Sequence, residues 1–362
     1  MNRKVNGVYY PLNMPVLYIT QDQVGIPTGG GLVTGFEMET LASLGEGIVK
    51  LDRSVVEVSS DPFENDERFC QAVKRHVAER GIPRMAHFYA GCFTMTVEYL
   101  KSKGTKISYT VDAHDPDLSI EEFGRCGIPY EHKHMSDKNL RTLHNKGCVL
   151  ADLMIVPSSN GEKIMKSVGC RRIAIIPHPV RNFEVSSLPE KFAVGYIGQA
   201  GPDKGLRYLS QAWKSEGLKD SRLILAGSHV ESMVSIWRRE GGRNVEIIGY
   251  VGRVEQFFGR VSVYVQPSVT EGFGIPVLEA MSMGRPVIVS QGAGAVDAIS
   301  SSVKPIGMDV PIRDPKAIAQ AIRFYRDYPD KIEEHGRNGQ TQSKSYSMES
   351  IRDRYLAAWG SL

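Results

Sequence analysis

The alternation of strand and helix signals is the feature that most constrains the fold of this chain. Short runs rich in β-branched and aromatic residues alternate with stretches of helical periodicity from one end to the other. Alternation of this kind predicts parallel sheets covered by helices, so the expected fold class is α/β. The predicted strands cover residues 16–20, 85–89, 106–111, 153–156 and 172–176 in the first half, and residues 192–197, 222–226, 245–248, 262–266 and 286–290 in the second.

The length of the chain predicts two domains, because 362 residues exceed what one hydrophobic core usually supports. Residues 182–190 (NFEVSSLPE) are polar and contain a proline, which favours a linker there. We therefore expect a first domain over residues 1–183 and a second over residues 184–341. Residues 342–362 would form a terminal helix that returns to the first domain, where its apolar side chains would pack: Ile351, Tyr355, Leu356 and Trp359.

The composition is that of an ordinary soluble globular protein, with 41% hydrophobic and 23% charged residues. No apolar run approaches membrane-spanning length, and the first residues lack the apolar stretch of a secretory signal. We expect a cytoplasmic protein, with weak association to a membrane surface left open. A net charge of +3 does not argue for a nucleic-acid partner, and the five cysteines show no metal or redox spacing.

Residues 271–290 (EGFGIPVLEAMSMGRPVIVS) place two glutamates eight positions apart around a Gly/Pro turn. The preceding strand stops at Pro267, and Pro276 suits a helix start, so Glu271 would lie on a loop and Glu279 one turn into a helix. Ligands of parallel sheets bind beyond the carboxyl ends of the strands, where a helix N-terminus suits phosphate. Carboxylates beside it would accept hydrogen bonds from hydroxyls, and a sugar nucleotide carries both groups. Alternatively, Glu271 is a solvated loop residue and Glu279 a charge favoured by the helix dipole.

Two further loops join a predicted strand to a predicted helix. Residues 27–35 (PTGGGLVTG) form a glycine-rich loop that allows close approach to a ligand, although its spacing is not a dinucleotide fingerprint. A flexible surface loop is the alternative. Residues 195–205 (GYIGQAGPDKG) end near Lys204, which would neutralise a diphosphate as it leaves. The alternative there is an exposed pair of Asp203 and Lys204.

Residues 109–117 (YTVDAHDPD) carry His114 at the end of a predicted strand. His114 is suited to hydrogen-bond a sugar hydroxyl or an acceptor, whereas a lone loop histidine is commonly a surface residue. Asp115 and Asp117 also match a D-x-D pattern that holds a divalent metal in one class of sugar transferases. The proline between them fits a plain turn, so we expect no metal and no other cofactor.

With these motifs in this order, the chain resembles the family 4 retaining glycosyltransferases of GT-B fold over nearly its whole length. Residues 151–159 (ADLMIVPSS) and 175–180 (IIPHPV) resemble the closing part of that family's first domain. The two glutamates of residues 271–279 are the specific element. The resemblance implies two Rossmann-like parallel-sheet domains that face each other across a cleft, with hinge motion between them.

The resemblance also implies a role for each site residue. The expected catalytic residues are His114, which would place the transferred sugar, Lys204, which would bind the diphosphate, and Glu271, which would contact the sugar hydroxyls. Glu279 would hold the ribose, and the nucleotide base would lie near residues 249–253. The donor-binding residues implied in all are Gly30 and Gly31 from the facing domain, Gln199, Tyr250, Gly272, Phe273, Gly274, Ile275 and Glu279.

One position departs from the family pattern. Gln199 stands where the family commonly has an arginine, so Lys204 and helix dipoles would carry more of the charge compensation. The implied function is metal-independent transfer, with retention, of a hexose-type sugar from a nucleotide-diphosphate sugar to an unidentified acceptor hydroxyl. The acceptor would be a lipid-linked sugar, a polysaccharide, a protein or a small molecule. The alternatives are a sugar-nucleotide epimerase or hydrolase on the same fold, and a non-catalytic nucleotide-sugar-binding protein.

Overall fold

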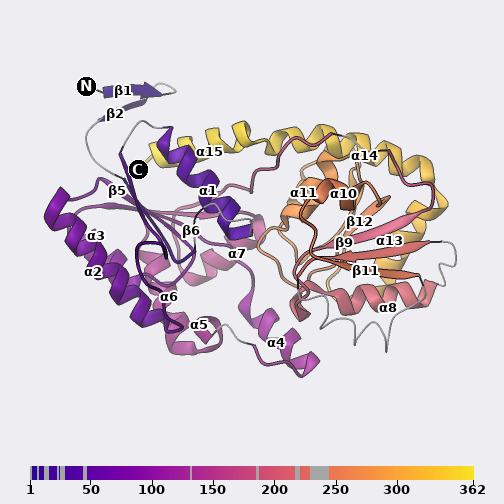
Figure 1. Ribbon diagram of the computed structural model, residues 1–362, viewed down its shortest axis with the longest axis horizontal. Coiled ribbons are helices and arrows are strands. Elements are labelled where there is room, and N and C mark those ends of the chain that lie inside the picture. Colours follow the sequence, from indigo (N-terminus) through magenta and orange to yellow (C-terminus); the bar gives the residue numbers. More distant parts are fainter. Residues whose placement is uncertain are drawn as a thin grey trace. The chain divides into compact units, whose positions relative to one another are not determined.

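The computed structural model describes residues 2–5, 8–11, 16–22, 24, 29–43, 47–130, 133–184, 187–216, 221–228 and 244–362. The chain divides into two compact units (Figure 1). Unit 1 contains Met1–Ala113, Glu131–Pro177 and Ile351–Leu362, and unit 2 contains His114–Tyr130 and His178–Ser350. A helix expected within residues 230–239 lies outside the described residues.

Unit 1 is built on a six-stranded sheet in which every neighbouring pair of strands is parallel. The strand order is β4 (Ile48–Leu51), β3 (Val16–Thr20), β5 (Met85–Tyr89), β6 (Lys106–Thr110), β7 (Leu153–Val156) and β8 (Ile173–Ile175). Its helices are α1 (Gly29–Ala42), α2 (Pro62–Arg80), α3 (Thr94–Ser102), α5 (Lys133–Ser136), α6 (Lys138–Leu150), α7 (Ser159–Val168) and most of α15 (Met348–Gly360). A separate antiparallel pair joins β1 (Asn2–Val5) to β2 (Val8–Pro11).

Unit 2 has a second six-stranded parallel sheet. The strand order is β11 (Val245–Gly249), β10 (Arg222–Ala226), β9 (Ala193–Ile197), β12 (Val263–Gln266), β13 (Val287–Ser290) and β14 (Gly307–Val310). Its helices are α4 (Pro116–Cys126), α8 (Leu206–Glu216), α10 (Val254–Phe258), α11 (Ile275–Ser282), α12 (Val296–Ser300), α13 (Pro315–Asp327) and α14 (Pro329–Ser343), with 3₁₀ turns η1 (Pro202–Lys204) and η2 (Lys344–Tyr346). The prediction of an α/β chain with two Rossmann-like parallel sheets is confirmed.

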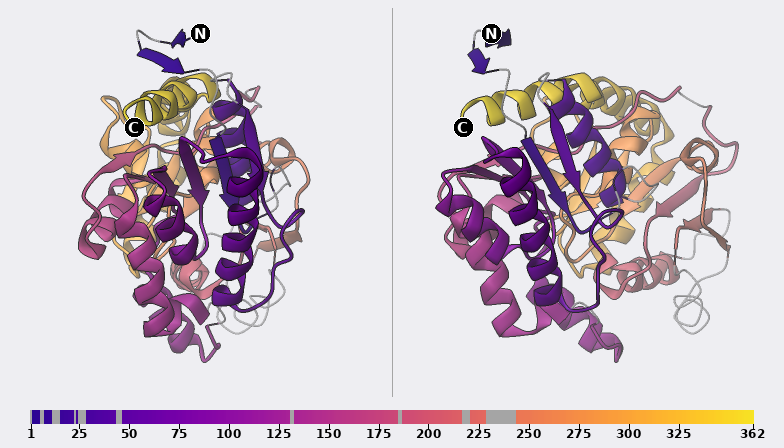
Figure 2. Two further views of the ribbon diagram at one scale, coloured as in Figure 1. Left: turned by 90° about the vertical axis from the view of Figure 1, so that its left-hand side faces the viewer. Right: turned by 60° about the vertical axis from the view of Figure 1, so that its left-hand side comes forward.

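Helices cover both faces of the unit 1 sheet (Figure 2), and each face has its own chemistry. On one face the strands present apolar side chains, such as Phe88 and Tyr109, which join Phe69 of α2 and Val97 of α3 in one core. On the other face Tyr18, His87 and Ser108 lie in register on neighbouring strands. Because strand side chains alternate between faces, the same three strands build an apolar core and a buried polar row.

The unit 2 sheet is apolar on both faces, as expected for a parallel sheet between two helix layers. Val194, Leu225 and Val265 join a core with residues of α8 and α13. On the opposite face Ile224 and Val289 join a core with residues of α10, α11 and α12. All five of these strand side chains are fully buried. The sheet therefore gives a rigid support to the loops at its carboxyl edge.

The domain boundary predicted from the sequence placed residues 114–130 in the first domain, whereas the structure places them in unit 2. They group with unit 2, because α4 makes its side-chain hydrogen bonds to Thr270, Asp203, Tyr208 and Arg313 of that unit. The chain passes from unit 2 to unit 1 for the last time at Ile351, three residues into α15. Among the described helices, none is both long enough and apolar enough to cross a membrane.

Candidate donor-binding site

Lys204 and Glu271 lie together at the carboxyl edge of the unit 2 sheet. Lys204 ends η1, which follows β9, and Glu271 follows the neighbouring strand β12. The Lys204 Nζ lies 2.6 Å from Glu271 Oε2. The backbone joins the same two loops, since the Val269 N–H donates to the Asp203 carbonyl over 2.8 Å. Parallel strand ends thus bring together two residues that are 67 positions apart.

The close approach of these loops depends on glycine at position 205. Gly205 has a φ of +71°, in the left-handed region that glycine adopts without strain. A Cβ at this position would lie only 1.9 Å from the Pro267 carbonyl oxygen. The glycine that follows Lys204 therefore allows the backbone after β12 to pass directly beneath the ion pair.

The ion pair between Lys204 and Glu271 is largely withdrawn from solvent, with exposed side-chain fractions of 19% and 18%. Burial alone would lower the pKa of Lys204, but the carboxylates of Glu271 and Asp203 overcome it and raise the pKa well above the usual value for lysine. Lys204 is therefore a fixed cation at neutral pH. Its charge also offsets the repulsion that Glu271 alone would exert on a phosphate.

Helix α11 begins directly behind this pair and carries Glu279 one turn in. Gly274 is its N-cap residue with a φ of +100°, and no side chain caps the helix among the described residues. The loop before it is held by the N–H of Glu271 on the Gly292 carbonyl and by the N–H of Ala295 on the Phe273 carbonyl, at 3.0 and 2.8 Å. The helix start is thus fixed without a side-chain cap from any described residue, and the positive end of the helix dipole at this point is suited to an anion.

Glu279 on α11 has an unusual pKa. Burial, and after it the negative charge of Glu255 on α10, raise the pKa of Glu279 to about 7, against the opposing effect of Arg181. The site thus holds one carboxylate that is paired with a cation and one carboxyl group that titrates near neutral pH. Strongly shifted groups of this kind concentrate at functional sites. Sequence analysis identified Glu279 but not Glu255, which has no motif of its own.

Two polar side chains of β12 make hydrogen bonds next to the carboxyl edge of the sheet. Tyr264 OH donates to the Ile197 carbonyl over 3.2 Å, and Gln266 Nε2 donates to Ser268 Oγ over 2.8 Å. Burial, the neighbouring Tyr196 and the charges of Glu279 and Glu271 raise the pKa of Tyr264 well above its usual range. Sequence analysis missed these residues, because polar residues inside a strand give no signal of a site until the register is known.

His114 is brought to the same edge by the segment that contains α4. The backbone N–H of Asp115 donates to Thr270 Oγ1 over 2.7 Å, and Ser119 Oγ donates to Asp203 Oδ2 over 3.2 Å. Thr270 and Asp203 are the chain neighbours of Glu271 and Lys204. The residue that follows His114 in the chain is therefore bonded to the loop that carries Glu271. No local signal in the sequence predicts either contact.

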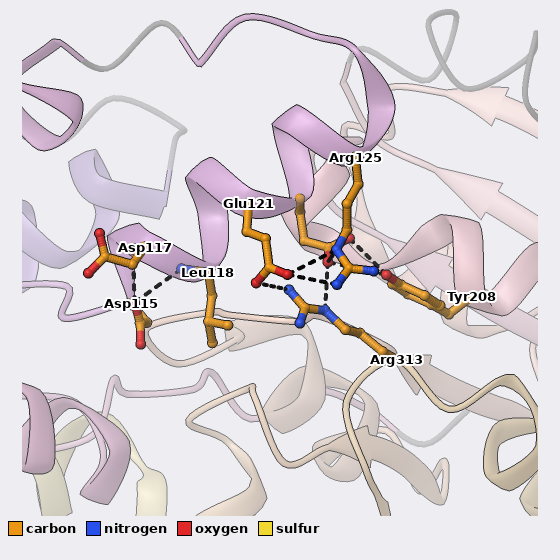
Figure 3. Close-up of polar contacts among 8 residues, drawn as sticks. Asp115, Asp117, Leu118, Glu121, Arg125, Tyr208 and Arg313 are labelled. Carbon is orange, nitrogen blue, oxygen red and sulfur yellow. Dashed lines mark hydrogen bonds and ion pairs between the residues drawn. The ribbon is translucent and has the colours of Figure 1, made fainter.

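The Asp115 carboxylate caps the start of α4. One Asp115 carboxylate oxygen accepts the N–H groups of Asp117 and Leu118 at 2.9 and 3.2 Å, which caps the start of α4 (Figure 3). This is the turn chemistry of aspartate followed by proline. Within the described ranges, no three or more His, Cys, Asp or Glu side chains are grouped so that they could hold a metal ion.

The remaining predicted residues occupy separate places. Gln199 follows β9 with an exposed side chain, and its carbonyl accepts Tyr196 OH over 2.9 Å. Tyr250 is exposed directly after β11. Gly30 and Gly31 belong to unit 1, where they lie in the first turn of α1 and not in a loop before it. A helix can start on glycines, because its first N–H groups need no helical partner. The roles assigned to these four residues stay predictions.

Most of unit 2 is similar in sequence to known glycosyltransferases. Residues 191–326 match the family model described as "Glycosyl transferases group 1". The capsular polysaccharide biosynthesis glycosyltransferase CapM of Staphylococcus aureus is 30% identical over 159 residues, which are 42% of this chain and 41% of CapM. O-antigen chain mannosyltransferase B of Escherichia coli is 30% identical over 173 residues, 45% and 44% of the two chains. The similarity thus spans less than half the length of either relative.

Solved structures are similar over nearly the whole chain. Sucrose-phosphate synthase from Thermosynechococcus elongatus has a TM-score of 0.76 with 20% identity, over 96% of this chain and 98% of its own. HepE from Anabaena in complex with UDP-glucose has a TM-score of 0.70 with 18% identity, over 96% and 100%. The chain therefore has the GT-B fold.

Proposed function

We propose that this chain is a glycosyltransferase of group 1 that uses a nucleotide-diphosphate sugar as donor. The observation that carries the proposal is the ion pair of Lys204 and Glu271 at the start of α11. It lies within residues 191–326, the part that matches the family model. The complexes of HepE with UDP and with UDP-glucose support a donor of this chemical class.

Each part of a sugar nucleotide finds a suitable group in the proposed site. The diphosphate would lie at the start of α11 and beside Lys204, where helix N–H groups and an ammonium offer positive charge. Glu271 would accept hydrogen bonds from the hexose hydroxyls and Glu279 from the ribose hydroxyls. The base would lie near Tyr250. His114 would contact the sugar from the side of α4.

The proposed reaction breaks the bond between the anomeric carbon of the sugar and the diphosphate oxygen. The acceptor hydroxyl attacks from the face that the diphosphate leaves, so the anomeric configuration is retained. Its proton passes to the departing phosphate oxygen, and the nucleoside diphosphate is released. Lys204 stabilises the charge that develops on that oxygen, and we propose that no metal is needed.

Gln199 makes Lys204 more important in this proposal. A neutral amide cannot replace the bidentate pairing of a guanidinium with phosphate. Gln199 is exposed, at the position where the family that the sequence resembles commonly has arginine, so charge compensation falls to Lys204 and to α11. We expect a lower donor affinity than an arginine would give, and Gln199→Arg should raise it.

A donor panel tests the proposal. The protein is incubated with UDP-glucose, UDP-galactose, UDP-N-acetylglucosamine, GDP-mannose and ADP-glucose, with and without EDTA and with mixed acceptor sugars, while nucleoside-diphosphate release is measured. Release that increases with acceptor and persists in EDTA supports a metal-independent transferase. Equal release without acceptor indicates a hydrolase, and binding of a nucleoside diphosphate without any release indicates a non-catalytic binding protein.

A further inference from the structure

Helix α4 is held on unit 2 by a charged cluster near its C-terminal end (Figure 3). Its centre is Glu122, which is only 1% exposed. Arg313 Nε donates to Glu122 Oε1 over 2.6 Å, and Tyr208 OH donates to Glu122 Oε2 over 3.0 Å. A buried carboxylate that loses such partners is strongly destabilising, so these three residues require one another.

A second, more exposed layer surrounds this centre. Arg313 Nη2 donates to Glu121 Oε2 over 2.8 Å, and Arg125 Nη2 donates to Glu121 Oε1 over 2.7 Å. Arg313 also has a φ of +59°, which residues other than glycine rarely adopt. It precedes Asp314, the N-cap of α13. The loop before α13 thus holds Arg313 in an uncommon backbone conformation while its guanidinium binds two successive glutamates of α4.

The other end of α4 is fixed beside the donor site. Thr270 Oγ1 accepts the backbone N–H of Asp115, and Asp203 Oδ2 accepts the hydroxyl of Ser119. Thr270 is 3% exposed, and the contact with Asp115 is partly buried. The helix is therefore attached to unit 2 at both ends, although the chain before His114 and after Tyr130 belongs to unit 1.

From this double attachment we propose that α4 is a positioning element of the donor site. Glu122, Arg313 and Thr270 hold His114 beside Lys204 and Glu271, and His114 moves with unit 2 in any motion between the units. None of the three is a catalytic residue, because each acts through the placement of His114. The consequence for catalysis rests on the proposed function, whereas the attachment itself does not.

Hydrogen–deuterium exchange tests the attachment without any activity. In Glu122→Gln and in Thr270→Val, the amides of residues 115–126 should exchange at least tenfold faster than in the wild type. Amides of α13 should be unchanged in Thr270→Val. The matched control is Glu121→Gln, which removes an exposed partner of the same arginine and should leave α4 protected. Wild-type protection of α4 in both test variants would overturn the proposal.

Kinetics test the positioning of His114. With the panel donor that the wild type cleaves fastest, Thr270→Val and Glu122→Gln should lower kcat at least tenfold, with KM for the donor and Kd for its nucleoside diphosphate within twofold. In a His114→Ala background the same substitutions should cause no further loss. The proposal would be overturned if Thr270→Val or Glu122→Gln lowered kcat by the same factor in the His114→Ala background as in the wild type. A rise in Kd for the nucleoside diphosphate that parallels the loss of kcat would also overturn it. If the wild type cleaves no panel donor, the proposed function fails, and the exchange experiment still decides whether α4 is anchored as described.

Discussion

The ammonium of Lys204 and the carboxylate of Glu271 lie 2.6 Å apart, on neighbouring strand ends of one parallel sheet. The pair is four-fifths buried, and it stands at the start of a helix that has no side-chain cap among the described residues. The positive charge of Lys204 offsets the negative charge of Glu271 before a ligand arrives. A diphosphate would then meet the cation, while the sugar hydroxyls would meet the anion.

Glu271→Gln should change the pH dependence of activity at alkaline pH. Glu271 is the main group that raises the pKa of Lys204 against the effect of burial. Without it Asp203 is the main group left to oppose the effect of burial, so Lys204 should lose its proton at a lower pH than in the wild type. Donor cleavage by the variant should therefore decline at an alkaline pH at which the wild type stays active. Glu246→Gln, which breaks the surface pair with Arg260 at 2.6 Å, is the control. If donor cleavage by Glu271→Gln and by the wild type declines at the same alkaline pH, Glu271 does not raise the pKa of Lys204.

Glu279 should make the stability of the protein depend on pH between about 4.5 and 7. Its pKa is raised from 4.5 to about 7 in the folded protein, so its favourable contribution is complete below the lower value and is lost as pH rises through the upper one. The wild type should therefore lose up to about 3 kcal/mol more stability between pH 5 and pH 8 than Glu279→Gln does.

Urea unfolding at a series of pH values measures this difference. Glu255→Gln provides a matched test, because it removes the neighbouring charge that helps to raise the pKa of Glu279. The fall in stability should then move to lower pH. If the wild type and Glu279→Gln show parallel stability profiles, Glu279 does not titrate as described.

Gly205→Ala should destabilise unit 2 for two separable reasons. The φ of +71° costs about 1–2 kcal/mol for a residue with a Cβ, and the Cβ would also lie 1.9 Å from the Pro267 carbonyl oxygen. Gly127→Ala is the matched control, since Gly127 has a φ of +69° and no atom within 4 Å of the added Cβ. Chemical unfolding should show a clearly larger loss for Gly205→Ala. Equal losses of stability in Gly205→Ala and Gly127→Ala would mean that the loop after β12 moves away from position 205 at little cost.

The polar row of unit 1 should contribute to the docking of α15. Fully buried Glu37 accepts Tyr18 OH at 2.7 Å and Tyr355 OH at 2.9 Å, and His87 Nε2 lies 3.2 Å from it. Burial opposes its ionisation, but His87 and the hydroxyls of Tyr18 and Thr110 lower the pKa of Glu37. Its contribution to stability is therefore present at neutral pH and is lost on acidification.

Glu37→Ala should lower the free energy of unfolding by about 3–5 kcal/mol at pH 7, because it removes the carboxylate to which the other members of the buried network are bonded. Tyr355→Phe, which deletes one hydroxyl of the same network, should cost only about 1–3 kcal/mol. Urea unfolding and hydrogen exchange in residues 351–360 check both values. Equal, small losses would show that α15 docks by apolar contact alone.

The strands and helices that the sequence predicts best are those with strong local signals. The predicted strand over residues 222–226 matches β10 residue for residue. The edge strands β4 and β14 were not predicted, since each has only four residues and includes a charged one, Lys50 or Asp309. Helix α14 was missed because its glycines resemble helix breakers. A Cβ at Gly336 would lie 2.2 Å from the Gly284 carbonyl, so this glycine serves close packing behind α11.

The site was predictable where it depends on strand ends, and not where it depends on distant contacts. Parallel strands place Lys204 and Glu271 at one edge, which the order of elements in the sequence implies. The attachment of Asp115 to Thr270 joins positions 155 residues apart, and the cluster of Glu122 with Arg313 joins positions 191 apart. Neither contact has a local sequence pattern. The sequence therefore assigned residues 114–130 to the first domain, although they group with unit 2.

The decisive measurement is nucleoside-diphosphate release from the donor panel by the wild type and by Lys204→Met. At least one sugar nucleotide should be cleaved when an acceptor is present. Lys204→Met should lower kcat about 100-fold or more, as the loss of a group that stabilises charge in the transition state does. No release from any donor, or equal release from the wild type and Lys204→Met, would contradict the proposed function.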